Sequence, residues 1–345
     1  MNIDRRAFFK IAAAGAATAW CPGPAAARPP KELPPEAVGI LYDATLCIGC
    51  KACEVACKAE NDMPMAHDTP LEQAHGVAGI WDADNDLNSR TMTKIKVYTS
   101  GTAAVKDREQ DGFSFIKRSC MHCVDPNCIS ACPVSALTKD PFTGVVRYNP
   151  DACIGCRYCQ LACPFNIPKF EYDKAFPKIV KCQLCPDRLA AGGIPACCDA
   201  CPTGASLFGR LPDLLTEAHR RLTFKPGERQ QYPVRRVDGD EQRETEVKGY
   251  YPKVYGETES GGTQYLMMAG VPFDKLGLPP VGDTSRAQLS ETIQHTLYQG
   301  MMAPTLLLGG LVFAVYRRTH AEQEQEDASE DVEPATEARE GRRDA

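Results

Sequence analysis

Residues 153–164 read CIGCRYCQLACP, and this stretch decides the fold. Its first three cysteines are separated by two residues each, the fourth follows after three residues, and a proline comes directly after it. Related arrangements occur four times in the 345-residue chain, which holds 18 cysteines. Core packing does not require so regular a set of thiols, so the pattern predicts that the cysteines act in groups of four.

The four groups vary in their inner spacing but share one step, because three residues always separate the third cysteine from the fourth. The quartets are Cys47, Cys50, Cys53 and Cys57; Cys120, Cys123, Cys128 and Cys132; Cys153, Cys156, Cys159 and Cys163; and Cys182, Cys185, Cys197 and Cys201. Cys21 and Cys198 remain outside them. Cys197 is preferred to Cys198 because only Cys197 keeps the step to Cys201, and the swapped assignment stays an alternative.

Three kinds of chemistry compete for these thiols. Disulfides are common in exported proteins, and zinc ribbons also use sets of four ligands. Neither requires the repeated three-residue step with a following proline, which is typical of bacterial iron–sulfur sequences whose fourth cysteine binds the neighbouring cluster. We therefore predict that sixteen cysteines hold the iron of four [4Fe–4S] clusters.

The spacing has a physical reason. A tight loop over the first three cysteines directs backbone N–H groups at one cluster, and Gly49 and Gly155 allow the backbone to approach closely. The three-residue step makes one helical turn, which moves the fourth thiol about 6 Å along the axis towards a second cluster. A proline then turns the chain away, except after the first quartet, where Lys58 stands instead.

Residues 1–27 have the features of a cleaved export signal. Arg5 and Arg6 precede a short apolar run, and Ala25, Ala26 and Ala27 offer a small-residue cleavage site. The paired arginines resemble the bacterial twin-arginine signal, which implies export of a protein already folded around its cofactor. An ordinary secretory signal is the alternative.

The C-terminal region is predicted to anchor the chain in a membrane. Residues 297–316 lack charged side chains and are long enough for one transmembrane helix, with a buried core helix as the alternative. Arg317 and Arg318 mark the cytoplasmic side, which leaves the cysteine-rich body on the periplasmic side of the inner membrane. Residues 317–345 are expected to form a disordered, acidic, cytoplasmic tail.

Composition and motifs argue against several functions. The net charge is −6, and we see no basic surface for nucleic acid. The chain lacks the sequence motifs of serine hydrolases, zinc proteases and phosphate-binding loops, and every C-x2-C pair belongs to a quartet. A self-contained enzyme is therefore disfavoured, and no catalytic residue is predicted.

The quartets resemble the four-cluster ferredoxin-like subunits of membrane-bound respiratory oxidoreductases over residues 38–215. The resemblance implies an α+β fold with two pseudo-symmetric ferredoxin-like units, in which the first quartet pairs with the fourth and the second with the third. Implied ligands are Cys47, Cys50, Cys53 and Cys201 for cluster 1; Cys182, Cys185, Cys197 and Cys57 for cluster 2; Cys120, Cys123, Cys128 and Cys163 for cluster 3; and Cys153, Cys156, Cys159 and Cys132 for cluster 4.

Three stretches are more specific: YDATLCIGC at 42–50, CMHCVDPNC at 120–128 and IQHTLYQGMM at 293–302. They resemble the iron–sulfur subunit of hydrogenase-2-type membrane-bound nickel–iron hydrogenases. This resemblance implies electron transfer between the hydrogenase small subunit, which accompanies the large subunit, and a polytopic quinone-reactive membrane subunit. The alternative is the same role beside a molybdenum or tungsten formate dehydrogenase or a sulfur-compound reductase.

The resemblance divides the chain into a first unit (38–118 with 170–215), a second unit (119–169) and an irregular extension (216–296) that packs on partners. Thr93–Thr99 is strand-like. His122 is predicted either to tune a cluster or simply to pack, and His295 and Tyr298 either to lie near a quinone or to be interfacial. Basic residues crowd the cysteine stretches and either offset cluster charge or form a solvated surface: Lys51, Lys58, Arg118, Lys139, Arg157, Lys169, Lys178 and Lys181.

Overall fold

The computed structural model describes residues 28–64 and 86–330. Arg28–Ser290 forms one compact unit, called the body below. Helix α8 (Arg286–Glu330) begins at the end of the body, and from Glu291 on it belongs to a second unit. The predicted export signal, residues 1–27, lies outside the described residues.

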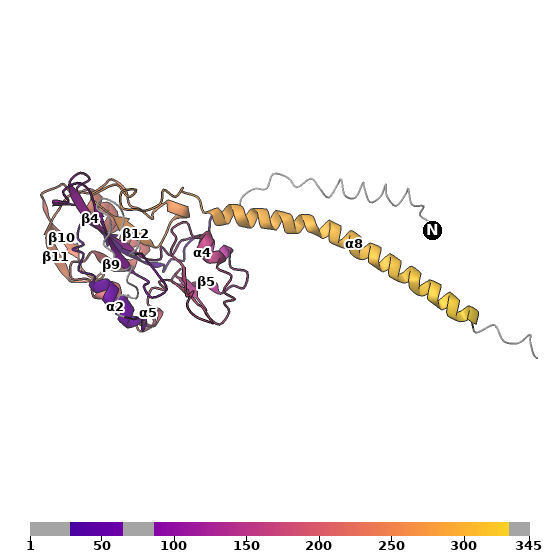
Figure 1. Ribbon diagram of the computed structural model, residues 1–345. Coiled ribbons are helices and arrows are strands. Elements are labelled where there is room, and N and C mark those ends of the chain that lie inside the picture. The colour runs from indigo at the N-terminus through magenta and orange to yellow at the C-terminus, as the bar shows by residue number, and fades with distance from the viewer. Residues whose placement is uncertain (1–27, 65–85, 331–345) are drawn as a thin grey trace, which may run out of the picture. The chain divides into compact units, whose positions relative to one another are not determined.

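A three-stranded sheet forms the centre of the body (Figure 1). Strand β1 (Val38–Asp43) pairs antiparallel with β9 (Ser206–Arg210) and parallel with β12 (Tyr265–Met268). The apolar run in β1 is buried on both faces, and helix α7 (Leu211–Leu222) packs on one of them through Leu214. The sheet therefore joins three segments that lie far apart in the sequence.

The remaining strands form small sheets around this centre. β4 (Gly112–Arg118) pairs with β2 (Lys94–Thr99) and β3 (Val105–Lys106), and β2 confirms the strand expected near Thr93–Thr99. The two-stranded sheets are β5 (Leu137–Lys139) with β6 (Val146–Tyr148), β7 (Lys169–Phe170) with β8 (Ile179–Val180), and β10 (Arg229–Pro233) with β11 (Gln242–Glu246). Within the body, α4 and β5 lie at the opposite end from β10 and β11 (Figure 1).

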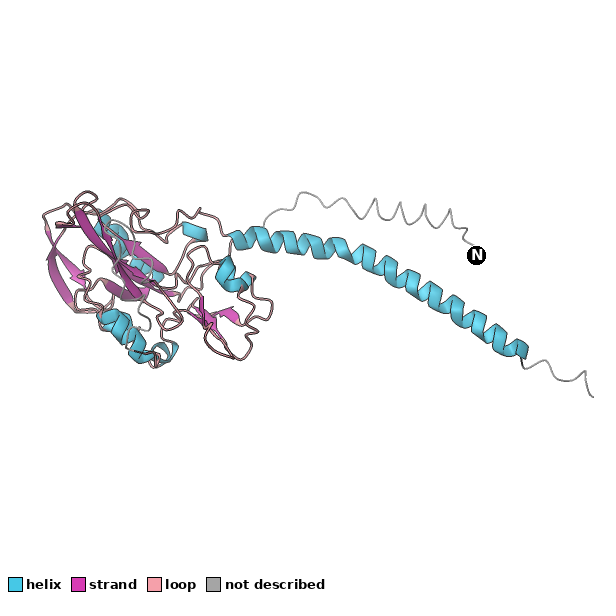
Figure 2. Cartoon of the chain, viewed as in Figure 1, coloured by secondary structure: helices cyan, strands magenta, loops and turns pink. Residues whose placement is uncertain are grey.

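Short helices and loops make up much of the rest (Figure 2). The helices are α2 (Ala52–Glu60), α3 (Asn127–Ser130), α4 (Tyr158–Ala162), α5 (Pro186–Ala190), α6 (Ala196–Asp199) and the 3-10 turn η3 (Glu259–Gly261). The third cysteine of each quartet lies in α2, α3, α4 or α6. The predicted helical turn between third and fourth cysteines is therefore confirmed.

Residues 216–296, expected to form an irregular extension, contain regular elements that belong to the body. This segment supplies the hairpin β10–β11 and the central strand β12, all four residues of which are buried. Tyr265, Leu266, Met267 and Met268 are each at most 1% exposed. The apolar run of β12 is too short to be recognised as a strand from the sequence, because glycines, prolines and charged residues surround it. Its partner β1 is also remote in sequence.

The C-terminal region also differs from the expectation. Residues 297–316 lie inside the 45-residue helix α8, and no helix of the described residues is both long and apolar enough to cross a membrane. The predicted transmembrane helix is thus not confirmed: the prediction rested on the absence of charge, and uncharged polar residues such as Tyr298 and Thr305 reduce the apolar character. Residues 317–330, expected as disordered tail, continue the helix, where Ala, Glu and Gln are good helix formers.

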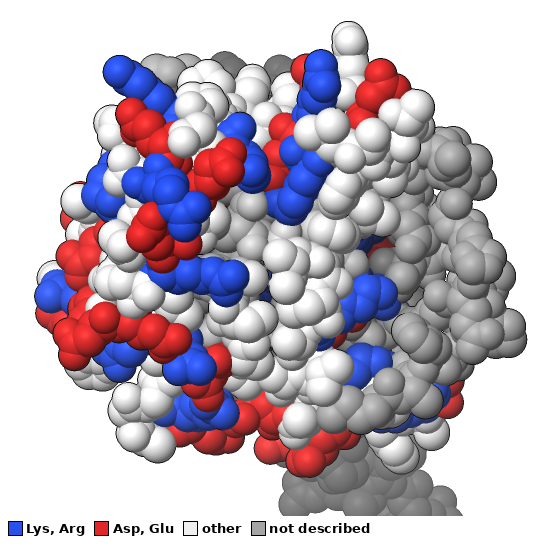
Figure 3. All heavy atoms as spheres, turned by 90° about the vertical axis from the view of Figure 1, so that its left-hand side faces the viewer, with Lys and Arg blue, Asp and Glu red and all other residues white. Residues whose placement is uncertain are grey.

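Charges of both signs interleave on the face of the body that carries β10 and β11 (Figure 3). Arg235 and Glu241 form an ion pair of 2.8 Å there, and Arg236 and Asp238 one of 3.0 Å. This face therefore presents mixed charge.

Candidate functional site

The first site is a cavity lined by four thiols from two distant quartets. Its cysteines are Cys47, Cys50, Cys53 and Cys201. Cys47 follows the end of β1, whereas Cys201 shortly precedes β9. Because β1 and β9 pair side by side, with Tyr42 opposite Ser206, the central sheet brings the first and fourth quartets together. We call this cavity site 1.

A second cavity, site 2, lies next to it along helix α2. Its cysteines are Cys57, Cys182, Cys185 and Cys197. Cys53 and Cys57 are one turn apart in α2, so this helix contributes one thiol to each cavity. Cys197 lines site 2, while Cys198 is fully buried in the hydrophobic core. The cavity therefore favours Cys197 over Cys198 as the fourth-quartet thiol.

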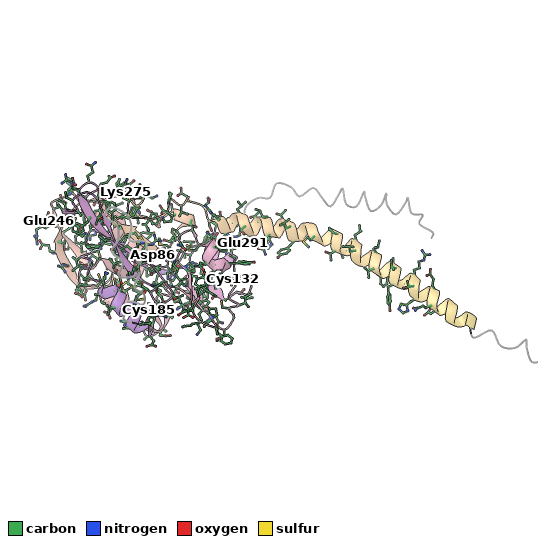
Figure 4. All side chains as sticks on the ribbon, viewed as in Figure 1. Asp86, Cys132, Cys185, Glu246, Lys275 and Glu291 are labelled. Carbon is green, nitrogen blue, oxygen red and sulfur yellow. The ribbon has the colours of Figure 1, made fainter. Side chains whose placement is uncertain are left out.

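The second and third quartets meet in another part of the body, where Figure 4 shows Cys132 well separated from Cys185. Site 4 is a cavity whose cysteines are Cys132, Cys153, Cys156 and Cys159. Site 3 consists of four thiols that lie close enough to influence one another's pKa: Cys120, Cys123, Cys128 and Cys163. The structure thus brings all sixteen predicted cysteines together in four groups of four.

All seventeen described cysteines are free thiols. Burial raises the pKa of most of them: to about 12 for Cys53 and Cys128, and to about 11 for Cys159. Cys197 is different, because a hydrogen bond from the Cys198 thiol and the nearby Lys117 ammonium together lower its pKa to about 5 despite burial. Buried thiols of this kind need a strong Lewis acid or a cation to become thiolates.

The sites follow one another in numerical order. The Cys197 thiol of site 2 affects the pKa of Cys53 in site 1, and the Cys120 thiol of site 3 affects that of Cys182 in site 2. In the same way the Cys159 thiol of site 4 affects the pKa of Cys128 in site 3. Because the interaction between two charges weakens with distance, these mutual effects indicate that each site lies near the next.

The loops of the sites direct hydrogen-bond donors at sulfur. Backbone N–H groups of Gly49 and Leu184 donate to the sulfurs of Cys47 and Cys182, each at 3.4 Å. Gly49 has a φ of 69°, and a side chain there would collide with the Phe115 ring. The glycine predicted to permit close backbone approach does so in the structure.

An orphaned buried donor supplies a test of whether the residues fit an iron–sulfur cofactor. His122, between two cysteines of site 3, is 1% exposed, and its Nδ1 accepts a hydrogen bond of 3.2 Å from the Val146 N–H. The proton therefore sits on Nε2, which has no partner among the described residues. Burial holds the pKa of His122 well below its usual value, so the ring is neutral. A cluster sulfur is an acceptor of the kind this N–H requires.

The basic residues singled out in the sequence fall into two classes. Lys139 and Lys181 are turned inward: the Lys139 ammonium donates to the carbonyl of Cys123 at 2.7 Å, and the Lys181 ammonium donates to the carbonyls of Val146 and Cys182 at 2.6 and 3.1 Å. Arg118 is also buried, and donates to Phe165 O at 3.0 Å. Lys51, by contrast, is exposed. The charge-offsetting interpretation therefore suits only part of the set.

The predicted quinone-proximal residues lie on α8, outside the body. His295 is exposed, and Tyr298 is 60% exposed and accepts a hydrogen bond from the Gln294 amide at 3.2 Å. They belong to the second unit, whereas the sixteen predicted cysteine ligands belong to the body.

Lys117 is a residue of the site region that no sequence pattern indicates. It lies in β4 with its side chain fully buried between sites 1 and 2. Burial lowers its pKa, but the nearby Cys197, Tyr265 and Cys53 groups raise it and the net direction is upward. A lysine beside Arg118 and Ser119 gives no signal of burial, since its environment is made by residues far away in the sequence.

Comparison with known proteins agrees with this geometry. Residues 112–211 match the family model described as a 4Fe-4S dicluster domain. The class of protein is therefore that of the ferredoxin-like [4Fe–4S] proteins, with mixed α and β structure.

Two relatives extend the comparison beyond that domain. The chain is 44% identical over 337 residues to the hydrogenase-2 operon protein HybA of Escherichia coli O157:H7, which covers 96% of this chain and 100% of the relative. It is 32% identical over 278 residues to the formate dehydrogenase-O iron-sulfur subunit of Escherichia coli K12, which covers 79% of each. The chain belongs to the family of the hydrogenase-2 operon protein HybA.

Proposed function

We propose that this chain is the electron-transfer subunit of a membrane-bound nickel–iron hydrogenase and is not catalytic by itself. It passes electrons between the hydrogenase small subunit, which works with the large subunit, and an integral membrane subunit that reacts with quinone. The observation that carries the proposal is the 44% identity to HybA over 96% of the chain. The four groups of four thiols support it, since they suit four [4Fe–4S] clusters with the ligands predicted from the sequence.

The clusters, when bound, supply one-electron redox chemistry. The succession of sites 1 to 4 supports a path along the body. Exposed apolar side chains flank its two ends: Ile48 and Val55 beside site 1 are 59% and 56% exposed, and Ile154 and Leu161 beside site 4 are 65% and 84% exposed. Apolar surface at both ends supports contact with two different partners.

The chain's own residues exclude water and fix charge around the path. Cys47 and Cys53 of site 1 and Cys57 of site 2 are at most 8% exposed, so these thiols are shielded from solvent. Burial raises the pKa of Cys120 and Cys128 in site 3, and the positive charge of Lys181, which is 3% exposed, offsets part of that rise. Buried cations stabilise thiolates that would otherwise be costly in a dry interior.

The location follows from the same family membership. We place the body on the periplasmic side of the inner membrane, after export directed by residues 1–27. Helix α8 exposes large apolar side chains, with Leu306, Val312 and Phe313 at 70%, 64% and 61%. Side chains of this kind support association with the membrane-bound partner rather than with water.

Purification of the complex through a tag on this chain tests the proposal. We expect nickel and hydrogenase subunits to co-purify, with about 16 iron atoms per copy of this chain beyond those of its partners. Molybdenum or tungsten in place of nickel would instead support the alternative, a subunit of a formate dehydrogenase or sulfur-compound reductase. The identity to the formate dehydrogenase subunit, 32%, is lower than the 44% identity to HybA. About eight iron atoms would contradict four clusters.

A further inference from the structure

Lys117 occupies an unusual place in the body. It is fully buried, and its ammonium donates a hydrogen bond of 3.0 Å to the hydroxyl of Ser206, which lines site 1. The ammonium also lies 5.9 Å from the centre of the Tyr265 ring. The ammonium is also close enough to Cys197 of site 2 to lower the pKa of that thiol. Lys117 therefore stands between two of the four sites.

The charge of Lys117 needs a counter-charge. Taking an ammonium out of water is costly unless it is paired with an anion. Lys117 forms no ion pair with a carboxylate in the described part of the chain, and the hydroxyl of Ser206 is neutral. The groups beside it that can carry a negative charge are the sulfurs of Cys53 in site 1 and Cys197 in site 2, which are thiolates when they bind a cluster. The two sites together thus provide what the ammonium lacks.

Comparison with Lys94 separates this arrangement from ordinary burial. Lys94 lies on the paired strand β2 and is 4% exposed, but its ammonium is 3.9 Å from the Glu54 carboxylate. The opposite charges of Lys94 and Glu54 largely cancel for any group further away. Lys117 has no carboxylate partner in the described part of the chain, so its positive charge acts on both thiol sites. Reduction of a cluster adds negative charge, and a nearby fixed cation stabilises the reduced form.

We propose that Lys117 is a positioning residue for electron transfer: one buried positive charge shared by sites 1 and 2, which raises the reduction potentials of both. The inference rests on the proposed function, because it requires clusters in these sites.

The test is a redox titration of the purified complex followed by electron paramagnetic resonance. Lys117→Met removes the charge and keeps a similar length, and Lys248→Met removes an exposed lysine of the body as the matched control. In Lys117→Met we expect two of this chain's four midpoint potentials to fall together, each by a tenfold change in the reduction equilibrium, or about 59 mV for a one-electron couple. Lys248→Met should leave all four unchanged.

The outcomes separate the inference from the function on which it rests. A wild-type chain without its iron refutes the proposed function. A wild-type chain with its clusters, but with no change in midpoint potentials in Lys117→Met, overturns only the role of Lys117, and so does an equal fall of all four or a fall of one alone. If Lys117→Met binds less iron, Ser206→Ala decides, since it keeps the ammonium but removes its hydrogen-bond acceptor. In Ser206→Ala the midpoint potentials of sites 1 and 2 must change while those of the other two sites do not. If the potentials of sites 1 and 2 stay the same, the inference is overturned.

Discussion

Replacement of Arg221 by methionine is predicted to destabilise the body strongly. Arg221 lies in α7 with its side chain fully buried, and its Nη1 is 2.8 Å from the Asp43 carboxylate at the end of β1. Its Nε is 2.7 Å from the Glu217 carboxylate. In Arg221→Met the Asp43 carboxylate keeps hydrogen bonds from Tyr250 and Thr45 but loses its only buried counter-charge among the described residues.

The size of the effect follows from that geometry. Removing one partner of a buried ion pair costs about 3–5 kcal/mol, because the remaining charge is left in a low-dielectric interior. With a urea m-value of about 3 kcal/mol/M, this corresponds to a fall of about 1–1.7 M in the midpoint of unfolding. The loss is a large part of the roughly 5–15 kcal/mol that stabilises a typical folded domain.

Arg220→Met is the matched control. Arg220 binds the same Glu217 carboxylate at 2.6 Å, but its side chain is 41% exposed, so we expect a cost of about 0–1 kcal/mol. Unfolding in urea is followed in the holoprotein by far-UV circular dichroism and by the visible absorbance of the clusters. All variants are incubated in the same way. Equal midpoints for the two arginine variants would refute the reasoning, since burial of the Asp43–Arg221 pair is the difference between them.

Three further predictions concern the sites and the pH response. Cys57→Ser should change the same cluster signal in electron paramagnetic resonance as Cys185→Ser, because both thiols line site 2. If Cys57→Ser instead changes the signal that Cys50→Ser changes, the grouping of Cys57 with site 2 is wrong. His122→Phe should lower one midpoint potential, that of site 3, by removing the orphaned Nε2–H, and an unchanged potential would exclude a hydrogen bond to the cluster. Burial raises the pKa of Glu217, but hydrogen bonds and charge from its two arginines outweigh burial and lower it overall, so its contribution to stability is present above pH about 4.3 and is lost as the pH falls further. Glu217→Gln should therefore lose less stability than the wild type between about pH 6 and pH 3, as measured by urea midpoints.

Much of the site could be predicted from the sequence because its geometry is local. The step from Cys53 to Cys57 is one turn of α2, and the loop at Gly49 brings its backbone to the Cys47 sulfur. Such features depend on a few neighbouring residues, so spacing and residue type are enough to identify them. The sixteen cysteines and the nature of the cofactor follow from these local rules.

Other features could not be read from any one stretch. Spacing alone left open which quartets share a site, and only the family resemblance suggested a grouping. In the structure, pairing of β1 with β9 places Cys47 near Cys201. The central strand β12 likewise escaped notice, because Tyr265 becomes a strand residue only through its pairing with Ile40.

The sequence by itself therefore predicted the sixteen cysteine ligands, the local loops and the chemistry of the sites. The tertiary structure decided which thiols face a common cavity, and it placed the buried Lys117 between two cavities. It also made the C-terminal part of the body a component of the core. The physical reason is that burial and electrostatic environment are set by contacts between segments remote in the chain, whereas turns and helical steps are set by adjacent residues.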